Sequence, residues 1–136
     1  MVALLCLPRQ QVLDTILSPA DAFLLFAALA DEVRERFWAA FVDEWGRVLS
    51  MRIGPPAGVS EAPLPIVELL HGAMSCGAFA LIVAHNHPGG DPAPSLQDVR
   101  TTRRLAQAAQ AIGIRLLDHV IVARDGCRSF RLEGLI

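Results

Sequence analysis

The sequence contains no lysine, so all twelve of its basic residues are arginines. Fourteen acidic residues outnumber them, and the formal net charge of −2 excludes a strongly basic protein that binds nucleic acid through its overall charge. The charge is uneven, because residues 1–68 hold five arginines against nine acids and residues 69–136 hold seven against five. Guanidinium groups suit bidentate contacts with carboxylate or phosphate, so the second half stays open to an anionic partner. A genome rich in G and C would explain the absence of lysine equally well.

Cysteine is also scarce, with three residues (Cys6, Cys76 and Cys127) and no Cys-x-x-Cys pair. An odd number of widely separated cysteines argues against a disulfide framework and a cysteine-rich zinc knuckle, and it indicates a reducing compartment. No uncharged apolar run approaches the roughly 20 residues of a membrane helix. Residues 1–7 are apolar, but they are too few for the core of a signal peptide and lack a basic flank. We therefore expect a cytoplasmic protein that does not enter a membrane.

A chain of 136 residues with 53% apolar and 19% charged residues is typical of one well-packed globular domain. Residues 1–17 carry few structural signals and are treated as a separate N-terminal segment, so the domain is placed at residues 18–136. A helix is expected to begin there. Ser18 fits the N-cap, Pro19 the first helical position and Asp21 the third.

The remaining pattern predicts a succession of helices and strands. The expected helices cover residues 18 to 29 or 32, 66–76 and 99–112, and the expected strands cover residues 36–42, 48–53, 78–84, 114–124 and 128–132. The strand at 36–42 is apolar on both faces, which indicates a central place in the sheet. The helix at 99–112 is expected to bury Leu105, Ala108, Ala109 and Ile112. This order predicts an α/β (α+β) fold with a mixed sheet and helices on its faces.

Polar residues follow the apolar strand at 78–84 where the chain leaves the core. Residues two apart in an extended backbone project to the same side, so His85 and His87 can converge on one ion. A loop rich in proline and glycine comes next, and then Ser95 opens a helical segment with Asp98 three residues on. Two imidazoles and one carboxylate are three protein ligands for zinc, with a fourth position left to water.

Each part of this pattern also has an ordinary structural interpretation. Ser95-x-x-Asp98 is a helix-capping pattern, and an acidic residue suits the positive end of a helix. A His-x-His pair is weak by itself, because histidines on strands are often only hydrogen-bonded. The capping and metal interpretations are compatible, since a helix N-terminus can also hold a carboxylate that faces a metal. The whole string from His85 to Asp98, directly after a buried strand, is much more specific than its parts.

The string His-Asn-His-Pro-x-Gly-Asp-Pro-x-Pro-Ser at residues 85–95, followed by Leu-Asp-His-Val-Ile-Val at residues 117–122, resembles a known signature. It is similar to the zinc-binding motif of the JAMM/MPN metalloprotease fold and, within it, to the bacterial RadC family. The resemblance runs from about residue 18 to the C-terminus. It implies a three-layer, cytidine-deaminase-like arrangement. The deaminase signature itself, His-x-Glu with a later Pro-Cys-x-x-Cys, is absent, and the string His-Asn-His is not the dispersed motif of HNH nucleases.

The resemblance implies a zinc-dependent hydrolase that cleaves an amide, peptide or isopeptide bond. In that mechanism His85, His87 and Asp98 would hold Zn²⁺. Ser95 would donate a hydrogen bond to the oxyanion of the reacting carbonyl.

Glu35 is the candidate for the general base, because an early-strand glutamate polarises the zinc-bound water in the JAMM pattern. The ordinary alternative is a solvated acid within the charged cluster at residues 31–36. Glu32 and Glu44 are the other candidates for this role.

Asp118 and His119 interrupt an apolar strand, and a buried polar pair needs hydrogen-bond partners. They are interpreted as structural residues, or as residues that support the metal ligands, rather than as ligands.

Two departures from the family bear on function. Longer relatives carry a small helical DNA-binding-type domain before the catalytic one, for which this chain has no room, and residues 66–67 are Ile-Val where relatives carry Pro-Arg. A nucleic-acid role that depends on that domain, and the role of that arginine, are therefore not carried over to this chain, and the chemistry of one zinc site favours a peptide or protein substrate. One alternative is a DNA-repair-associated protein that contacts nucleic acid through Arg100, Arg103 and Arg104, and another is a metal-stabilised interaction module without activity. No oligomeric state follows from the sequence.

Overall fold

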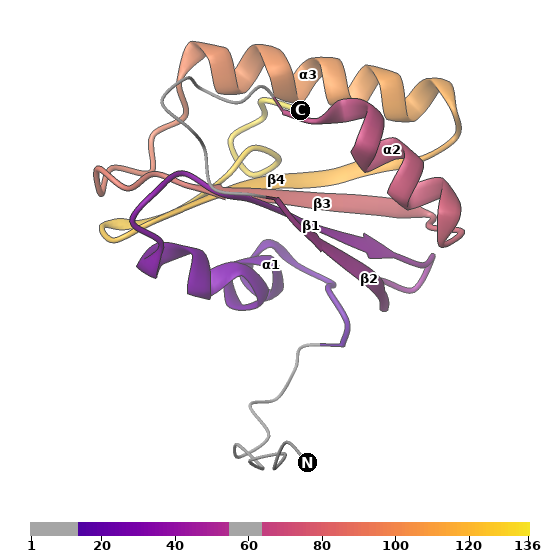
Figure 1. The fold of residues 1–136 in the computed structure, drawn as a ribbon, viewed down its shortest axis with the longest axis horizontal. Coiled ribbons are helices and arrows are strands. Elements are labelled where there is room, and N and C mark those ends of the chain that lie inside the picture. The colour runs from indigo at the N-terminus through magenta and orange to yellow at the C-terminus, as the bar shows by residue number, and fades with distance from the viewer. Residues whose placement is uncertain (1–13, 55–63) are drawn as a thin grey trace, which may run out of the picture.

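The structure is a computed structural model that describes residues 14–54 and 64–136. Within these ranges the centre is a five-stranded mixed sheet in the order β2-β1-β3-β4-β5. Its strands are β1 (Phe37–Val42), β2 (Val48–Ile53), β3 (Ala80–Asn86), β4 (Arg115–Ala123) and β5 (Gly126–Ser129). One face carries α1 (Pro19–Phe26) and the short 3₁₀ helix η1 (Ala27–Asp31), and the other carries α2 (Ile66–Ser75) and α3 (Leu96–Ala111) (Figure 1). The predicted fold class is confirmed. None of the described helices is long and apolar enough to cross a bilayer.

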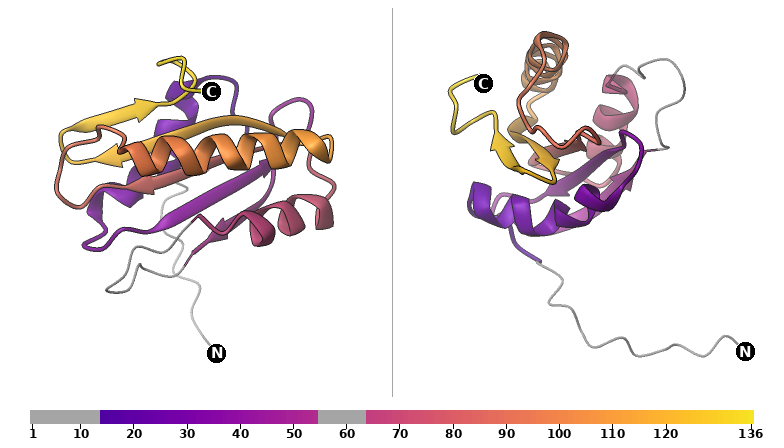
Figure 2. Two further views of the ribbon diagram at one scale, coloured as in Figure 1. Left: turned by 90° about the horizontal axis from the view of Figure 1, so that it is seen from above. Right: turned by 90° about the vertical axis from the view of Figure 1, so that its left-hand side faces the viewer.

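β3 lies in the middle of the sheet and joins its antiparallel and parallel parts. It pairs antiparallel with β1, with Phe37 opposite His85, and parallel with β4, with Asn86 opposite Val122. A parallel pair needs a crossover connection, and α3 supplies it by running along the face of the sheet (Figure 2). The C-terminal end of β3 and the N-terminal end of α3 therefore lie at the same edge of the molecule. β1 lies between β2 and β3, the interior place predicted for it.

Side-chain alternation along β3 divides its residues between two hydrophobic cores. The even-numbered apolar residues pack with α1, and the odd-numbered ones pack with α2 and α3. All seven residues of β3 are buried, so the strand is held from both sides. By the same alternation His85 faces α3 and Asn86 faces the layer of α1 and η1.

The helix start predicted at Ser18 is confirmed. Ser18 Oγ accepts a hydrogen bond from Asp21 N at 3.3 Å, and Asp21 Oδ2 accepts one from Leu17 N at 2.9 Å. The α-helix gives way to η1 after Phe26, and η1 ends at Asp31, between the two predicted ends.

Two predicted strands are displaced along the chain. The strand expected at 78–84 is β3 at Ala80–Asn86, because pairing with β1 and β4 continues through His85. The strand expected at 128–132 is β5 at Gly126–Ser129, because the chain turns immediately afterwards. The other predicted elements agree with the structure to within three residues at their ends, apart from the helix of residues 18 to 29 or 32, which is α1 followed by η1.

The prediction that Ile112 is buried is wrong, because its side chain is 45% exposed. Ile112 is the C-cap of α3, where the chain leaves the helix, and Ile114 enters the core in its place at 5% exposure. Leu105 and Ala109 are fully buried as predicted. Thr102 lies buried on the same helix, although it is polar.

The pair Ile112 and Ile114 offers a matched test of this packing. Ile114→Ala should lower the free energy of unfolding by about 2–4 kcal/mol, because it removes buried methyl groups and leaves a cavity. Ile112→Ala should cost less than about 1 kcal/mol, because much of that side chain already contacts water. Urea denaturation of both variants measures the difference. Equal losses would contradict the described end of α3.

Candidate metal centre

Three side chains bring their ligand atoms together at the C-terminal end of β3. The Nε2 atoms of His85 and His87 are 2.9 Å apart, and Asp98 Oδ2 lies 3.5 Å from the first and 3.2 Å from the second. Atoms that ligate one tetrahedral zinc ion at about 2.0–2.2 Å are separated from one another by about 3.4 Å, so these spacings fit a single ion. The predicted convergence of the two histidines and the aspartate is confirmed. In the ranges 14–54 and 64–136 it is the one group of this kind.

A chain of hydrogen bonds on the far side of His85 determines which of its two ring nitrogens carries the proton. Thr102 donates its hydroxyl proton to the carbonyl oxygen of Asp98 at 2.6 Å, so Thr102 Oγ1 can accept from His119 Nδ1, also at 2.6 Å. His119 Nε2 is then unprotonated and accepts from His85 Nδ1 at 2.7 Å. His85 therefore presents an unprotonated Nε2. The chain begins and ends at two of the three ligand residues.

His87 also carries its proton on Nδ1, because of a hydrogen bond to a different partner. Its Nδ1 lies 2.9 Å from the carbonyl oxygen of Asp91, which can only accept, so Nδ1 carries the proton. Both imidazoles thus direct a lone pair at each other, next to the Asp98 carboxylate. Three lone-pair-bearing atoms at these distances repel one another unless a proton or a metal cation lies among them. Two nitrogens and one carboxylate oxygen are the donor set that zinc accepts.

The same contacts shift the pKa values of the group. Burial opposes ionisation of Asp98, but the hydrogen bonds that His85 and His87 donate from Nε2 when their rings are protonated outweigh it and hold the pKa of this carboxyl well below its usual range. The pKa of His87 is raised, mainly because a second proton on this ring, at Nε2, is stabilised by a hydrogen bond to Asp98. Burial lowers the pKa of His119 well below its usual value, which keeps that ring neutral and able to accept from His85.

Of the three acids considered as a base, Glu35 is the one that approaches the centre. Its Oε1 lies 3.9 Å from His85 Nε2, and its side chain is 47% exposed. Glu32 instead pairs with Arg36 at 3.4 Å. Glu44 is exposed in the turn between β1 and β2, at the end of β1 away from His85.

Ser95 and Asp98 form the helix cap that the sequence pattern predicts. Ser95 Oγ accepts from Asp98 N at 3.0 Å, and Asp98 Oδ2 accepts from Ser95 N at 2.9 Å. The oxygen of Asp98 that closes the cap is also the one that faces the histidines. The hydroxyl proton of Ser95 is not used in the cap, so the serine can still donate a hydrogen bond.

His119 N donates to Asp118 Oδ1 at 2.8 Å, but the two side chains otherwise have different partners. Asp118 accepts hydrogen bonds from Arg131 N at 3.1 Å and from the hydroxyl of Ser129, so it fastens the turn that follows β5. His119 is buried against His85 and supports a ligand.

The structure brings two further residues to the centre that the sequence interpretation does not identify. Thr102 lies four residues after Asp98 on α3, and its signal is a polar residue within an apolar helical stripe. Asn86 lies between the two histidines and is buried on the opposite face of β3, where it bonds to the segment that carries Glu35. His71 is exposed on α2 and is not among the three residues of this group.

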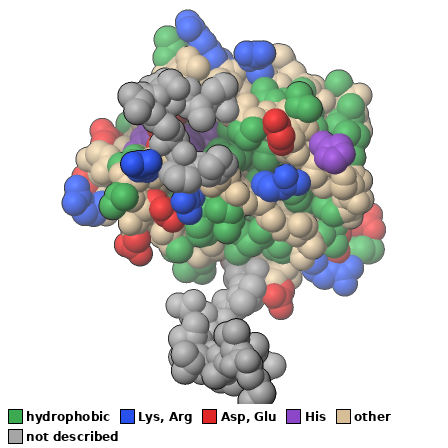
Figure 3. Space-filling view, viewed as in Figure 1, with side chains coloured by type: hydrophobic (Ala, Val, Ile, Leu, Met, Phe, Trp, Pro, Cys, Tyr) green, Lys and Arg blue, Asp and Glu red, His purple; other side chains and the backbone are tan. Residues whose placement is uncertain are grey.

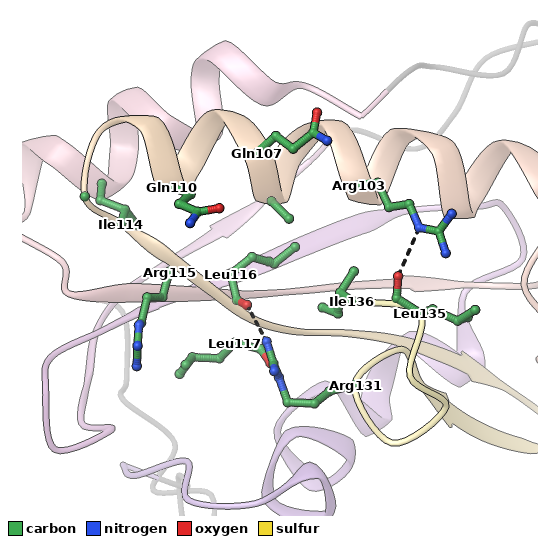
Figure 4. Close-up of a pocket in the computed structure, with 12 residues that line it drawn as sticks. Arg103, Gln107, Gln110, Ile114, Arg115, Leu116, Leu117, Arg131, Leu135 and Ile136 are labelled. Atoms are coloured by element: carbon green, nitrogen blue, oxygen red, sulfur yellow. Dashed lines mark hydrogen bonds between the residues drawn. The ribbon is translucent and has the colours of Figure 1, made fainter.

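An open groove of about 850 Å³ lies beside α3, on the side of β4 (Figure 4). Arg103, Arg115 and Arg131 line it, and no acidic side chain is among its described lining residues. Arg103 Nε donates to Leu135 O at 3.1 Å, and Arg131 Nη2 donates to Leu116 O at 3.0 Å. Two of the three guanidinium groups are thus partly used within the protein.

A three-layer fold that places His-x-His at the end of its central strand, and an aspartate in the first turn of the following helix, is that of the JAB/MPN class. Comparison with known families agrees. The family described as "RadC-like JAB domain" matches residues 16–135, and the chain belongs to it.

Curated relatives carry the name "UPF0758 protein". The chain is 41% identical over 102 residues to the one from Desulforudis audaxviator, which covers 75% of this chain and 44% of the relative. It is 40% identical over 109 residues to the one from Porphyromonas gingivalis, with 79% and 48% covered. It is 34% identical over 122 residues to the one from Aquifex aeolicus, with 90% and 53% covered. The chain thus spans about half the length of these relatives.

We expect the purified protein to carry about one metal ion per chain at this centre. His87→Ala should lose most of it, because two ligands hold an ion far less well than three. His71→Ala is the matched control, since this exposed histidine lies on α2, and it should retain the metal. Elemental analysis by mass spectrometry compares the three proteins. Equal metal in wild type and His87→Ala would disprove the ligand set.

Proposed function

We propose that this domain is a zinc-dependent hydrolase of the JAMM/MPN type that cleaves an amide, peptide or isopeptide bond. The observation that carries the proposal is the convergence of two unprotonated imidazole nitrogens and one carboxylate, with a further carboxylate, Glu35, 3.9 Å from His85 Nε2. The roles would be separate: His85, His87 and Asp98 would hold the ion, and Glu35 would be free to move a proton.

His85, His87 and Asp98 would hold Zn²⁺ through two nitrogens and one oxygen. Zinc bound there would polarise the substrate carbonyl and lower the pKa of the attacking water toward about 7. Thr102 and His119 would keep His85 in the tautomer that binds through Nε2.

Glu35 would take a proton from the attacking water and deliver it to the leaving amine. Its partial exposure suits this role, because the carboxylate needs contact with water and with the substrate nitrogen. Ser95 would donate its free hydroxyl proton to the oxygen of the reacting carbonyl, a type of contact that contributes about 3 kcal/mol to transition-state stabilisation.

An amide substrate is preferred over a phosphodiester because the described residues supply one metal group, whereas many nucleases and phosphatases use two ions.

A cytoplasmic location is part of the proposal. Cys76 and Cys127 are free thiols in the structure, which fits a reducing compartment.

A nucleic-acid function would rest on the arginines of the second half of the chain. On the face shown in Figure 3 basic side chains are scattered among acidic and apolar ones. The groove beside α3 gathers three arginines, but two of them bond to backbone carbonyls. These features favour the hydrolase over a DNA-binding protein.

Glu35→Gln should keep the metal and the fold while lowering hydrolysis by about 10²–10⁴-fold, because an amide cannot accept the proton. The zinc-loaded protein is incubated with a mixed peptide library, and new peptide termini are counted by mass spectrometry. Glu44→Gln, an exposed acid at the far end of β1, is the control and should retain activity. Bound zinc without turnover by wild type would instead support a metal-stabilised interaction module.

Duplex DNA should bind weakly, with a Kd of about 10⁻⁴ M or weaker near physiological salt, because non-specific affinity comes from phosphate neutralisation and the chain is net acidic. Fluorescence anisotropy at two salt concentrations measures it. Micromolar binding that weakens steeply with salt, and that disappears when Arg100, Arg103 and Arg104 are changed to alanine, would overturn the preference for a peptide substrate.

A further inference from the structure

Glu35 lies on a segment that has no regular structure of its own. Residues 32–36 connect η1 to β1, and among the described residues the backbone amides of residues 33–35 make no hydrogen bond to a protein group. The Glu35 carboxylate is nevertheless close to His85 Nε2. A general base must stay within hydrogen-bond reach of the proton that it abstracts, so something has to hold this segment in place.

The side chain of Asn86 supplies the contacts. Its Oδ1 accepts from Arg36 N at 2.6 Å, and its Nδ2 donates to Arg34 O at 2.9 Å and to Glu32 O at 3.2 Å. These bonds engage the carbonyl and both N–H groups of the amide, and the two shorter ones bracket Glu35. The side chain is buried, with the residue only 1% exposed, so each of these groups would be costly to leave unpaired.

The contacts require an asparagine in particular. The position needs one acceptor and two donors at the end of a short, rigid side chain. Aspartate offers no donor when ionised, serine and threonine offer one, and glutamine is longer by a methylene group within a filled core. The orientation of the amide follows as well, because the reversed one would place Oδ1 against two carbonyl oxygens.

Asn86 shares its strand with the metal ligands. His85 precedes it and faces α3, while Asn86 faces the layer of α1 and η1. One end of β3 therefore holds a candidate ligand on one face and the segment of the candidate base on the other. The pairing of Phe37 with His85, two residues after Glu35, adds a second connection between the same two parts.

We propose that Asn86 is a positioning residue that holds the Glu35 segment against the end of β3, and so sets the distance between the base and the metal centre. The inference rests on the proposed function for the identity of Glu35 as the base. Loss of the Asn86 amide would leave the ligands in place and let Glu35 move away.

The first arm of the test needs no metal. Amide hydrogen exchange is followed residue by residue by NMR in the metal-free protein. The Arg36 amide should be protected in wild type, and it should exchange at least about tenfold faster in Asn86→Ala, because its one acceptor is gone. Fast exchange of Arg36 in folded wild-type protein would overturn the proposal, whatever the function of the site.

The second arm measures where Glu35 lies relative to the ion. Co²⁺ is loaded in place of zinc, and the paramagnetic shift of the Glu35 carboxyl carbon is recorded in protein labelled with ¹³C-glutamate. Asn86→Ala should bind the same amount of Co²⁺, but the shift of Glu35 should fall toward that of exposed Glu44. A Glu35 shift that stays unchanged in Asn86→Ala would overturn the proposal.

Ser129→Ala separates positioning from general stability. It also removes a buried side-chain hydrogen bond, to Asp118, but at β5, away from Glu35. It should lower stability and leave the Glu35 shift unchanged, and a similar loss of shift in this control would contradict a specific role for Asn86.

If Asn86→Ala does not fold, Asn86→Ser replaces it, because serine is too short to reach the three backbone groups. If wild type binds no Co²⁺, the proposed function fails, and the metal-free arm still decides whether Asn86 holds the segment.

Discussion

The structure depends on a local electrostatic conflict, in which two imidazole lone pairs and a carboxylate meet at the end of β3. Such an arrangement is unfavourable by itself, because atoms of the same polarity face one another at hydrogen-bond distance. Each candidate ligand is fixed by a hydrogen bond on its other side. His85 bonds to His119, and His87 bonds to the carbonyl oxygen of Asp91. Asp98 is fixed by the helix cap that it forms with Ser95. A proton or a metal cation among these atoms removes the repulsion, and two nitrogens with one carboxylate oxygen are a donor set that suits zinc.

The central place of β3 makes this possible. The strand is paired on both edges and buried on both faces, so its end is stiff enough to aim side chains in opposite directions. Toward α3 it presents His85, which joins His119 and Thr102 in a chain of bonds that returns to Asp98. Toward η1 it presents Asn86, which bonds to the backbone around Glu35. All three layers of the fold thus contribute to one small volume.

Membership of the RadC-like JAB family agrees with this centre, since the family match covers residues 16–135 and the whole ligand set lies within it. The matched part of this chain covers 44–53% of the relatives named UPF0758. The groove beside α3 is lined by three arginines and by no acidic side chain among the described residues.

The features that the sequence by itself determined are those that depend on short-range geometry. Strand alternation relates His85 to His87, and the capping pattern relates Ser95 to Asp98, so the three candidate ligands could be named from the sequence. Only the tertiary structure decided the rest. It brought Glu35, about 50 residues before the histidines, close to His85, whereas Glu32 and Glu44 have other surroundings. It also joined Thr102 on α3 to His119 on β4. It also exposed Ile112 and gave Asn86 its three backbone partners. These contacts join segments that are distant along the chain, and their geometry is set by how the sheet and helices pack, which no local pattern encodes.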